Sequence, residues 1–257
     1  YDTVVVGSDE VWNLSHPWYG GCALFFGEGV RAERLVSYAA SLGNYGANGG
    51  LPEPWADLLR RFEAISVRDD NSRAIIRDTL GCEPDLVLDP CLLPVEQTGE
   101  EHGPEWQPGE PYVAVYGHNF NPWFGRAVRR WAEARGYRLV SIGYRNDWAG
   151  EQWITAGPEE FARFMAGAAA VATNFFHGCV FALRNERPFV CEDSAYRSIK
   201  IRDLMRVTGG ERPLVCEDTP PAEYDAHLSQ PVDPDILARI AGLRERSNAY
   251  LDKVVAT

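Results

Sequence analysis

The sequence lacks the features that define several large classes of protein. Its longest apolar run, residues 164–172, falls far short of the roughly 20 residues that a membrane helix needs. No basic-then-apolar secretory signal opens the chain. It contains no glycine-rich phosphate fingerprint, P-loop, nucleophile elbow or histidine-rich metal motif. We therefore expect no membrane span and no bound metal.

Cysteine pairs of the C-x-x-C type are also missing. The six cysteines are scattered, and most lie in apolar contexts such as residues 189–191. This spacing favours buried free thiols over a disulfide framework or a zinc site. Because free thiols are typical of a reducing compartment, we expect a cytoplasmic protein.

Positive charge is in short supply. Lys and Arg number 25 against 37 Asp and Glu, which gives a net charge of −12. Such a field repels DNA and RNA, so we expect no nucleic-acid partner. A small anionic substrate would need a local cationic site. What is present is typical of a globular protein with a sizeable core, since 45% of the 257 residues are hydrophobic and 24% are charged.

Short apolar segments alternate with segments of helical periodicity. We expect strands at residues 2–7, 34–40, 64–67, 86–88, 112–116, 138–142, 169–173 and 188–191. We expect helices at residues 54–62, 69–80, 124–136, 158–167, 178–185, 198–207 and 234–255. Residues 94–111 interrupt this pattern, because they are rich in Pro, Gly and Glu and lack periodicity.

The alternation predicts an α/β fold of two Rossmann-type domains. We place the N-terminal domain at residues 1–95, a linker at 96–111, and the C-terminal domain with its closing helices at 112–257. In such folds ligands bind beyond the carboxyl ends of the parallel strands. Two such domains facing each other would form a central cleft, so the residues that follow the strands are the candidate site.

Two of these residues can supply charge to a ligand. Arg68 follows an expected strand and precedes a helix, where a guanidinium can grip a phosphate or a carboxylate. His177 lies at a strand-to-helix turn of the second domain, where an imidazole can donate a hydrogen bond or act as a general acid. Each has a structural alternative: Arg68 can pair with Asp69 or Asp70, and His177 can satisfy backbone carbonyls.

Other polar or aromatic residues near strand ends are candidate substrate ligands. In the first domain these are Ser8, Asp9, Trp12 and Asn13. Trp12 is the candidate for stacking on a sugar, whereas Ser8 and Asp9 can instead cap a helix. In the second domain the candidates are Asn119, Arg145, Asn174 and Gly178. Gly178 would let a ligand approach the backbone, and Arg145 has the alternative of pairing with a surface acid.

The segments around these residues resemble one family. Residues 1–13 (YDTVVVGSDEVWN) resemble the FDxxIVGSDQVWN segment of polysaccharide pyruvyl transferases, 35–41 (LVSYAAS) their SYAAS, and 64–69 (AISVRD) their ISVRE. Residues 172–190 (ATNFFHGCVFALRNERPFV) are similar to TDSFHGTVFALxxxKPFV. The Asp-Pro turn at 88–90 and the closing helices around 201–205 and 246–251 also resemble the family.

The resemblance implies a GT-B-like fold and transfer of a pyruvyl group from phosphoenolpyruvate to a sugar of a polysaccharide or its precursor, often as a 4,6-ketal. It assigns Arg68 and His177 to binding or activating the donor. It implies a small-molecule donor and a glycan acceptor as partners, with no cofactor besides the donor substrate. In two respects the sequence departs from the family. Phe175 stands where the family has Ser, and the first domain is expected to lack the family's first strand and helix.

Two other functions stay open at this point. A GT-B-type glycosyltransferase would use a nucleotide sugar, with Asp193 or Asp147 as the nucleotide-binding acid. A non-catalytic relic of the fold would bind a sugar or a partner protein, and the departure at Phe175 motivates this hypothesis. A homo-oligomer, or a separate N-terminal piece, also stays open as a partner.

Overall fold

The computed structural model describes residues 1–46, 48–93, 109–193, 198–210 and 213–255. The chain divides into two compact units. Unit 1 comprises residues 1–94, 202–208 and 238–257, and unit 2 comprises residues 95–201 and 209–237. The expected linker at 96–111 lies largely outside the described residues. Residues 202–208 and 238–257 group with unit 1, whereas the sequence pattern placed them in the C-terminal domain.

Unit 2 contains a six-stranded sheet in which every neighbouring pair is parallel. Its strands are β5 (Tyr112–Tyr116), β6 (Arg138–Ile142), β7 (Glu151–Trp153), β8 (Ala170–Thr173), β9 (Phe189–Glu192) and β10 (Leu214–Val215). They lie in the order β10-β9-β8-β5-β6-β7. This is the strand order of a doubly wound sheet, and the direction of winding reverses between β5 and β8.

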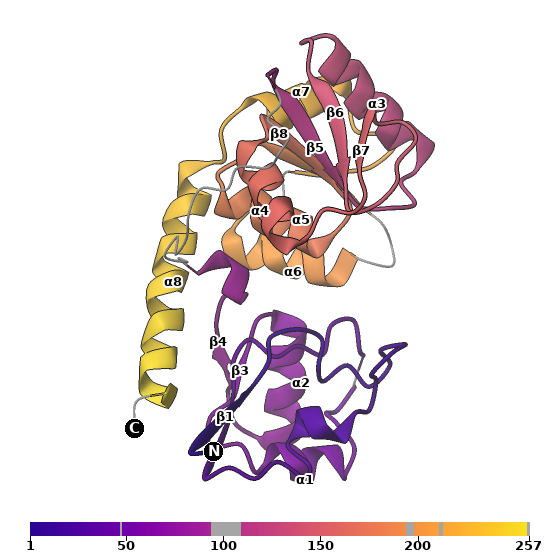
Figure 1. The fold of residues 1–257 in the computed structure, drawn as a ribbon. Helices are drawn as coiled ribbons and strands as arrows, with labels where there is room; N and C mark the ends of the chain where they lie inside the picture. The colour runs from indigo at the N-terminus through magenta and orange to yellow at the C-terminus, as the bar shows by residue number, and fades with distance from the viewer. Residues whose placement is uncertain (47, 94–108, 194–197, 211–212, 256–257) are drawn as a thin grey trace. The chain divides into compact units, whose positions relative to one another are not determined.

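Helices cover both faces of this sheet (Figure 1). They are α3 (Pro122–Glu133), α4 (Pro158–Gly167), α5 (Phe176–Arg184), the start of α6 (Ser198–Thr208) and α7 (Pro221–Ser229). Phe124 of α3 and Leu228 of α7 pack with Val113 in one buried cluster. The opposite face of β5 carries Tyr112, whose ring contacts Phe164 of α4. The alternation of side chains along β5 therefore serves two helical layers, as expected of a buried parallel strand.

Several of the unit 2 elements lie where the sequence predicted them, and three were missed. The bounds of β5, β6 and α4 agree with the predicted ranges. The short strands β7 and β10 and the helix α7 were not predicted. The two strands are only three and two residues long, so they show no periodicity. Pro220 and Pro221 at the start of α7 were an available signal, because proline favours the first turn of a helix.

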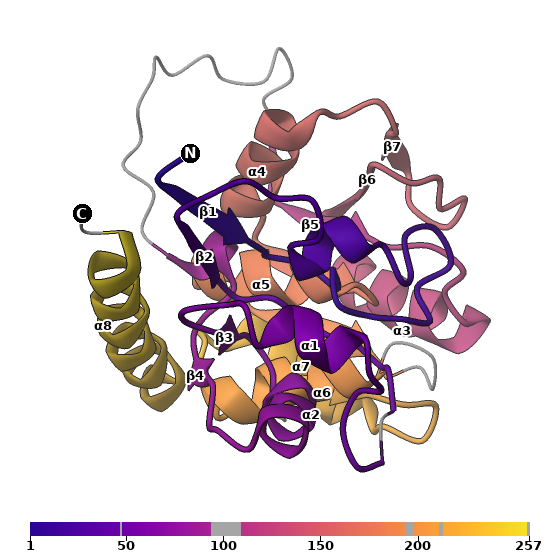
Figure 2. The ribbon, with the colours of Figure 1, turned by 90° about the horizontal axis from the view of Figure 1, so that it is seen from below.

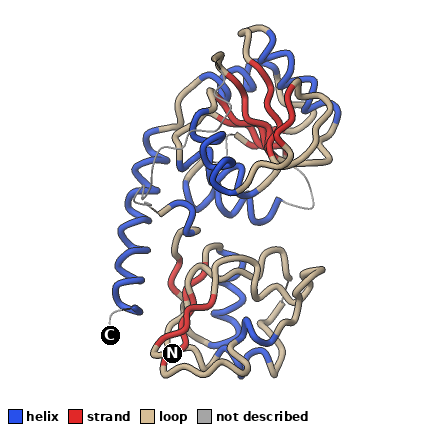
Figure 3. The backbone as a smooth tube through the Cα atoms, in the orientation of Figure 1, coloured by secondary structure: helices blue, strands red, loops and turns tan. Residues whose placement is uncertain are grey.

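Unit 1 has much less regular strand (Figure 3). Its strands are β1 (Thr3–Val6), β2 (Arg34–Ser37), β3 (Ser66–Val67) and β4 (Asp85–Leu86). β1 pairs with β2 and β3 pairs with β4, both in parallel. Two isolated parallel bridges, Val36 to Ala64 and Ala40 to Val67, join the pairs, so the four strands lie side by side (Figure 2).

Two serines complete the junction between β2 and β3. The Ser37 hydroxyl donates to the Ser66 carbonyl at 3.0 Å and accepts from the Ser66 N–H at 3.0 Å. In return, the Ser66 hydroxyl donates to the Ser37 carbonyl at 3.0 Å and accepts from the Ala39 N–H at 3.2 Å. These side chains satisfy buried backbone groups that a regular ladder would otherwise pair.

The helices of unit 1 include the last helix of the chain. They are η1 (Ala23–Phe26), α1 (Trp55–Leu59), α2 (Asp70–Leu80), η2 (Pro90–Leu92), α6 from residue 202 onward, and α8 (Pro234–Val255) from residue 238 onward. The Tyr250 hydroxyl of α8 donates to the Ser37 carbonyl at 2.8 Å, and the Ser247 hydroxyl accepts from the Leu88 N–H at 2.9 Å. These bonds join residues 213 and 159 positions apart in the chain, and they fix α8 on unit 1. No helix among the described residues is long and apolar enough to cross a membrane.

Candidate functional site

Arg68 lies at the carboxyl end of β3, immediately before α2. Its side chain is only 3% exposed. One terminal nitrogen donates to the Ser8 carbonyl at 2.8 Å and to Asp89 Oδ2 at 2.7 Å, and the other donates to Asp9 Oδ1 at 2.9 Å. Asp69 caps α2 by accepting from the Ser72 N–H at 2.7 Å. The alternative of a surface pair with a neighbouring acid is therefore wrong, because Arg68 is buried and its ion-pair partners follow β1 and β4.

The charge of Arg68 is stabilised by these partners. Burial by itself lowers the pKa of the guanidinium, but the nearby carboxylates of Asp89 and Asp9 outweigh burial, and the pKa is raised above its usual value. A buried arginine of this kind stays protonated at every physiological pH. Unit 1 thus holds a permanent positive charge at the carboxyl ends of its strands.

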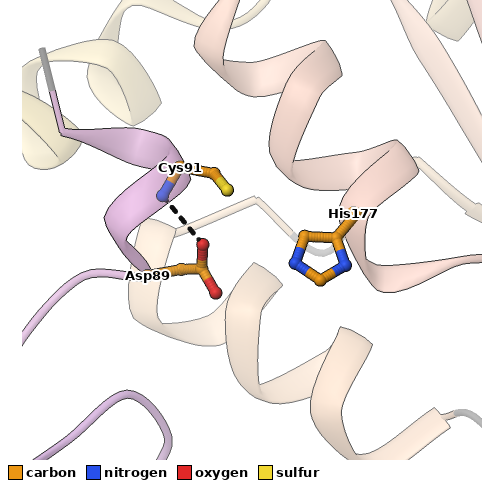
Figure 4. Close-up of side chains that lie close together, drawn as sticks. All are labelled: Asp89, Cys91 and His177. Carbon is orange, nitrogen blue, oxygen red and sulfur yellow. Dashed lines mark hydrogen bonds between the residues drawn. The ribbon is translucent and has the colours of Figure 1, made fainter. Parts of the chain in front are cut away.

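The two carboxylates that face Arg68 differ in exposure. Asp89 is 2% exposed, and its second oxygen accepts from the Cys91 N–H at 3.0 Å, as Figure 4 shows. Asp9 is 56% exposed. Asp89 is therefore the permanent counter-ion, and Asp9 is the partner that an incoming anion can replace at the lower desolvation cost.

Two other first-domain candidates, Trp12 and Asn13, are buried and hold the fold together, whereas Ser8 is half-buried and contributes its carbonyl to Arg68. Trp12 has no exposed surface, and its indole N–H donates to the Phe25 carbonyl at 2.8 Å. The Asn13 amide donates to Glu10 Oε2 at 2.9 Å, and its oxygen accepts from the Ser15 N–H at 3.0 Å. The expectation that Trp12 stacks on a sugar is corrected: its ring packs in the core with Phe26 and Phe62.

A tyrosine that the sequence pattern did not single out lies within the electrostatic reach of Arg68. The pKa of Tyr19 rises to about 12, first because the phenol is partly buried and then because Asp9 and Glu10 repel a phenolate. Arg68 acts in the opposite direction and is outweighed. Tyr19 comes near Arg68 only through the tertiary structure, since no short sequence motif joins the two residues.

In unit 2, His177 lies in the first turn of α5, which begins at Phe176, two residues earlier than predicted. The imidazole, labelled in Figure 4, is half-buried, and its ring meets that of Phe176 at 5.3 Å. The neighbouring Gly178 serves packing rather than ligand approach. A Cβ at Gly178 would lie 2.0 Å from Thr173 Oγ1, so only glycine lets the helix lie this close to β8.

At the point where the winding reverses between β5 and β8, a buried carboxylate and its amide partners form a hydrogen-bond network. Asn174 donates to the His118 carbonyl at 3.0 Å and to Glu192 Oε2 at 3.2 Å. The other oxygen of Glu192 accepts from the Asn121 N–H at 2.9 Å and from its side-chain amide at 2.6 Å. Glu192 and Asn174 are both buried, so Asn174 positions the loop after β5 and has little surface for a ligand.

Above this network three rings from different strand ends contact one another. The rings of His118 and Tyr144 are 5.2 Å apart, and Phe175 meets them edge to face at 5.2 and 5.1 Å. The ring of Tyr116 is a third neighbour of Phe175, with the centroids 5.1 Å apart. We call His118, Tyr144 and Phe175 the aromatic cluster. Phe175, the departure from the family pattern, is therefore integrated into the strand-end packing.

Two candidates of the second domain lie at the surface. Asn119 is exposed and adopts a left-handed conformation with φ of 55°. Arg145 is also exposed and pairs with Asp147 at 2.7 Å, which is the structural alternative that the sequence left open. Of the residues predicted for this domain, His177, Asn119 and Arg145 keep accessible side chains near the strand ends, whereas Asn174 and Gly178 are buried. His118, Tyr144 and Glu192 also follow strands in the sequence, but no motif singles them out as site residues.

Comparison with known proteins agrees with the resemblance. The family described as Polysaccharide pyruvyl transferase matches residues 1–195. This range includes both Arg68 and His177 and covers most of the chain. The protein therefore belongs to the polysaccharide pyruvyl transferase family, whose members are transferases. No curated protein matches the chain.

Solved structures agree on the fold at low sequence identity. The S. aureus MnaA–UDP co-structure has a TM-score of 0.54 at 12% identity and covers 98% of this chain and 75% of its own. A putative UDP-N-acetylglucosamine 2-epimerase from Listeria monocytogenes gives 0.52 at 13% identity, covering 97% and 72%. The glycotransferase of kitacinnamycin gives 0.51 at 13%, also covering 97% and 72%. These similarities confirm the predicted GT-B-like α/β fold.

Proposed function

We propose that this protein transfers the pyruvyl group of phosphoenolpyruvate to hydroxyl groups of a saccharide, forming a cyclic ketal and releasing phosphate. The observation that carries the proposal is the family match, which spans residues 1–195 and so includes both strand-end charges. Phosphoenolpyruvate is an anion with a carboxylate and a phosphate. In a protein of net charge −12, its binding requires local cations such as Arg68.

In the proposed reaction two sugar hydroxyls add in turn to the same carbon of the donor. An acid protonates the methylene carbon of phosphoenolpyruvate, which leaves a cationic centre at the adjacent carbon. A sugar hydroxyl attacks that carbon and loses its proton. Phosphate then leaves with the electron pair of the carbon–oxygen bond, and a second hydroxyl of the same sugar closes the ketal and loses its own proton. Of the two protons that the acceptor hydroxyls lose, one replaces the proton delivered to the methylene and the other goes to the leaving phosphate.

We assign the acid to His177, directly or through a water that it orients. An imidazole has an ordinary pKa of about 6.5, so it exchanges protons readily at neutral pH. His177 stands in the first turn of α5, where the helix N-terminus presents backbone N–H groups that favour an anionic substrate. The same N–H groups stabilise negative charge on the leaving phosphate.

We assign to Arg68 the role of the cation that binds the donor. The donor would replace Asp9 as a partner of Arg68. Arg68 is already paired with two carboxylates. A third anion would be repelled as long as both carboxylates stay in place. Exchange of the exposed Asp9 for the donor keeps the guanidinium compensated throughout. The expected signature is that Asp9→Asn strengthens donor binding, because it removes a competing charge.

The proposal is tested by thermal unfolding with phosphoenolpyruvate, alongside pyruvate, UDP and GDP. A ligand at about 100 times its dissociation constant stabilises the fold by about 2.7 kcal/mol, which gives a clear rise in Tm. We expect a saturable rise with phosphoenolpyruvate, a larger one for Asp9→Asn, and none for pyruvate. A rise with UDP or GDP and none with phosphoenolpyruvate would instead favour a nucleotide-sugar transferase.

Matched variants keep this test specific. Asp147→Asn removes a carboxylate that pairs with an exposed arginine of unit 2, so its donor affinity should stay that of the wild type. His177→Asn should bind phosphoenolpyruvate but fail to release phosphate when saccharide acceptors are added. Full phosphate release by His177→Asn would remove this residue from the mechanism.

A further inference from the structure

The loop that follows Asn13 presents an unusually exposed tryptophan. Trp18 is 88% exposed, whereas Trp12, only six positions earlier, is fully buried. His16 and Tyr19 flank it, and none of the three takes part in the proposed reaction. We call His16, Trp18 and Tyr19 the aromatic loop. The exposed indole forgoes the burial that large aromatic side chains usually gain, and it presents a flat apolar ring to a ligand.

The aromatic loop is held in one shape by its own contacts. The rings of His16 and Tyr19 stack with centroids 3.7 Å apart, and Trp18 meets His16 edge to face at 5.7 Å. The His16 imidazole accepts from the backbone N–H of Trp18 at 3.4 Å. The backbone N–H of Gly20 donates to the His16 carbonyl at 2.9 Å. A Cβ at Gly20 would lie 2.5 Å from that carbonyl, so glycine is required for the close turn. A ligand would therefore meet preorganised rings and pay little ordering entropy.

The loop starts from the turn that carries Asp9. The Val11 N–H donates to the Asp9 carbonyl at 2.7 Å, and the Asn13 N–H donates to the Glu10 carbonyl at 3.0 Å. The side chain of Asn13 then fixes the first residues of the loop through the Ser15 N–H. Tyr19 lies near enough for Asp9 and Glu10 to raise the pKa of its hydroxyl. The hydrogen-bonded turns between Asp9 and Gly20 therefore place the aromatic faces and a half-exposed carboxylate on one short segment of unit 1.

This combination fits the two sides of a pyranose ring. The axial C–H groups of a sugar carry partial positive charge and pack on the negative face of an aromatic ring. The hydroxyl edge needs strong acceptors, which Asp9 supplies, and Tyr19 can donate as well as accept. A neutral saccharide is the chemistry that matches both features.

We infer that the aromatic loop and Asp9 form a binding subsite for a pyranose ring of the saccharide acceptor, with Trp18 as the stacking platform. That the bound sugar is the acceptor rests on the proposed function, but saccharide binding at Trp18 can be measured without any transfer reaction. In this arrangement Asp9 faces the donor site through Arg68 and the acceptor through its exposed side.

The test is a calorimetric titration of the full chain with methyl hexopyranosides of the gluco, galacto and manno configurations, each with free O4 and O6. We expect a saturable heat signal with at least one of them, and weaker binding in Trp18→Ala. Affinity should fall about tenfold in Trp18→Ala, which corresponds to ~1.4 kcal/mol and is typical of one aromatic contact. Trp18→Phe keeps a ring and should retain part of the affinity.

The matched control is Leu24→Ala, which also removes an exposed large apolar side chain of unit 1 and should bind saccharide as the wild type does. Because Trp18 is almost fully exposed, its replacement should leave the Tm unchanged, so loss of binding cannot be ascribed to unfolding. Equal saccharide affinity of Trp18→Ala and the wild type would overturn the inference. So would the absence of any saccharide signal in the wild type, or a response to tetramethylammonium alone, which would indicate a cation site.

Parallel thermal shifts with phosphoenolpyruvate separate the two proposals. If phosphoenolpyruvate raises the Tm but the Trp18→Ala variant binds saccharide as the wild type does, the proposed function stands and the subsite is refuted. If saccharide binding depends on Trp18 but phosphoenolpyruvate does not change the Tm, the subsite stands and the proposed donor is refuted.

Discussion

The strand ends of the two units are built around buried charges of opposite sign. In unit 1 the charge is the guanidinium of Arg68, and carboxylates neutralise it. In unit 2 it is the carboxylate of Glu192, and neutral amides of Asn121 and Asn174 solvate it. An ion pair can exchange one partner for a charged ligand, whereas Glu192 has no counter-ion to exchange among the residues that the structure describes. We conclude that the unit 1 centre is suited to ligand exchange and the unit 2 centre to fixing loops.

The sheets show a related difference. Unit 2 has a six-stranded parallel sheet whose ladder fixes the strand ends by backbone hydrogen bonds. In unit 1 the strands are short, and the hydroxyls of Ser37 and Ser66 join β2 to β3. The positions of site residues in unit 1 therefore depend more on individual side chains. The following predictions use this contrast, from the largest expected effect to the smallest.

Alkaline pH should affect both units at once and so have the largest effect. Tyr38 and Tyr250 in unit 1 and Tyr112 and Tyr116 in unit 2 each have a pKa raised from 10 to about 12, chiefly by burial. The unfolded chain therefore loses these protons first. Stability is full below about pH 10 and falls as the pH rises toward 12. Urea midpoints measured across this range check the prediction, and a constant midpoint would contradict it.

Arg68→Ala should destabilise the protein far more than the loss of an exposed arginine does. It leaves Asp89 buried without its counter-ion, which costs about 3–5 kcal/mol of unfolding free energy. Arg145→Ala removes an exposed ion pair of unit 2 and should change stability by no more than about 0.5 kcal/mol. Urea denaturation of both variants measures the difference, and equal small losses would remove the proposed contrast between buried and exposed arginines.

Glu192→Gln should have an intermediate effect. One carboxylate oxygen becomes an N–H₂ group that faces other N–H donors, so at least one buried hydrogen bond is lost. The expected cost is about 1–3 kcal/mol by urea denaturation. Glu159→Gln on the exposed start of α4 is the matched control and should be neutral. A neutral Glu192→Gln would show that the charge at this position is dispensable for the loops.

Tyr224→Phe should have the smallest effect. The Tyr224 hydroxyl of α7 is buried and has no hydrogen-bond partner among the described residues. Removing a buried hydroxyl of this kind is expected to leave stability unchanged or raise it by up to about 1 kcal/mol. Tyr112→Phe, by contrast, deletes a 2.7 Å bond to the Phe164 carbonyl and should lower stability by about 1 kcal/mol. A loss in Tyr224→Phe as large as in Tyr112→Phe would indicate a partner for the Tyr224 hydroxyl.

Much of the fold follows from local sequence pattern. Apolar runs such as 112–116 and 138–142 are strands because β-branched and aromatic residues are enriched in them. Gly81 ends α2 in a left-handed conformation, as its place after the periodic segment predicted. Strands as short as β7 and β10 could not be predicted, because two or three residues carry no period and depend on pairing with a neighbouring strand.

The candidate site was predictable only in part. Arg68 and His177 were predicted as site residues because each stands between a strand pattern and a helix pattern, and the structure places both at strand ends, while their roles stay a prediction. Trp12 was assigned to a ligand and Trp18 was overlooked, although both lie in the same segment. Which indole turns inward depends on the space left by Phe26 and Phe62, and this space is set by residues beyond any local window.

The sequence by itself determined the alternation of strands and helices, the family, and the two residues of opposite domains that carry ionisable groups at strand ends. Tertiary structure decided what surrounds them. Arg68 meets Asp9 from 59 positions away and Asp89 from 21, and α8 returns to unit 1 through bonds from Ser247 and Tyr250. The physical reason is that helices and strands arise from contacts a few residues apart, which leave a periodic pattern in the sequence. Buried polar partners are chosen by desolvation and geometry between segments that are distant along the chain, and such choices leave no periodic pattern.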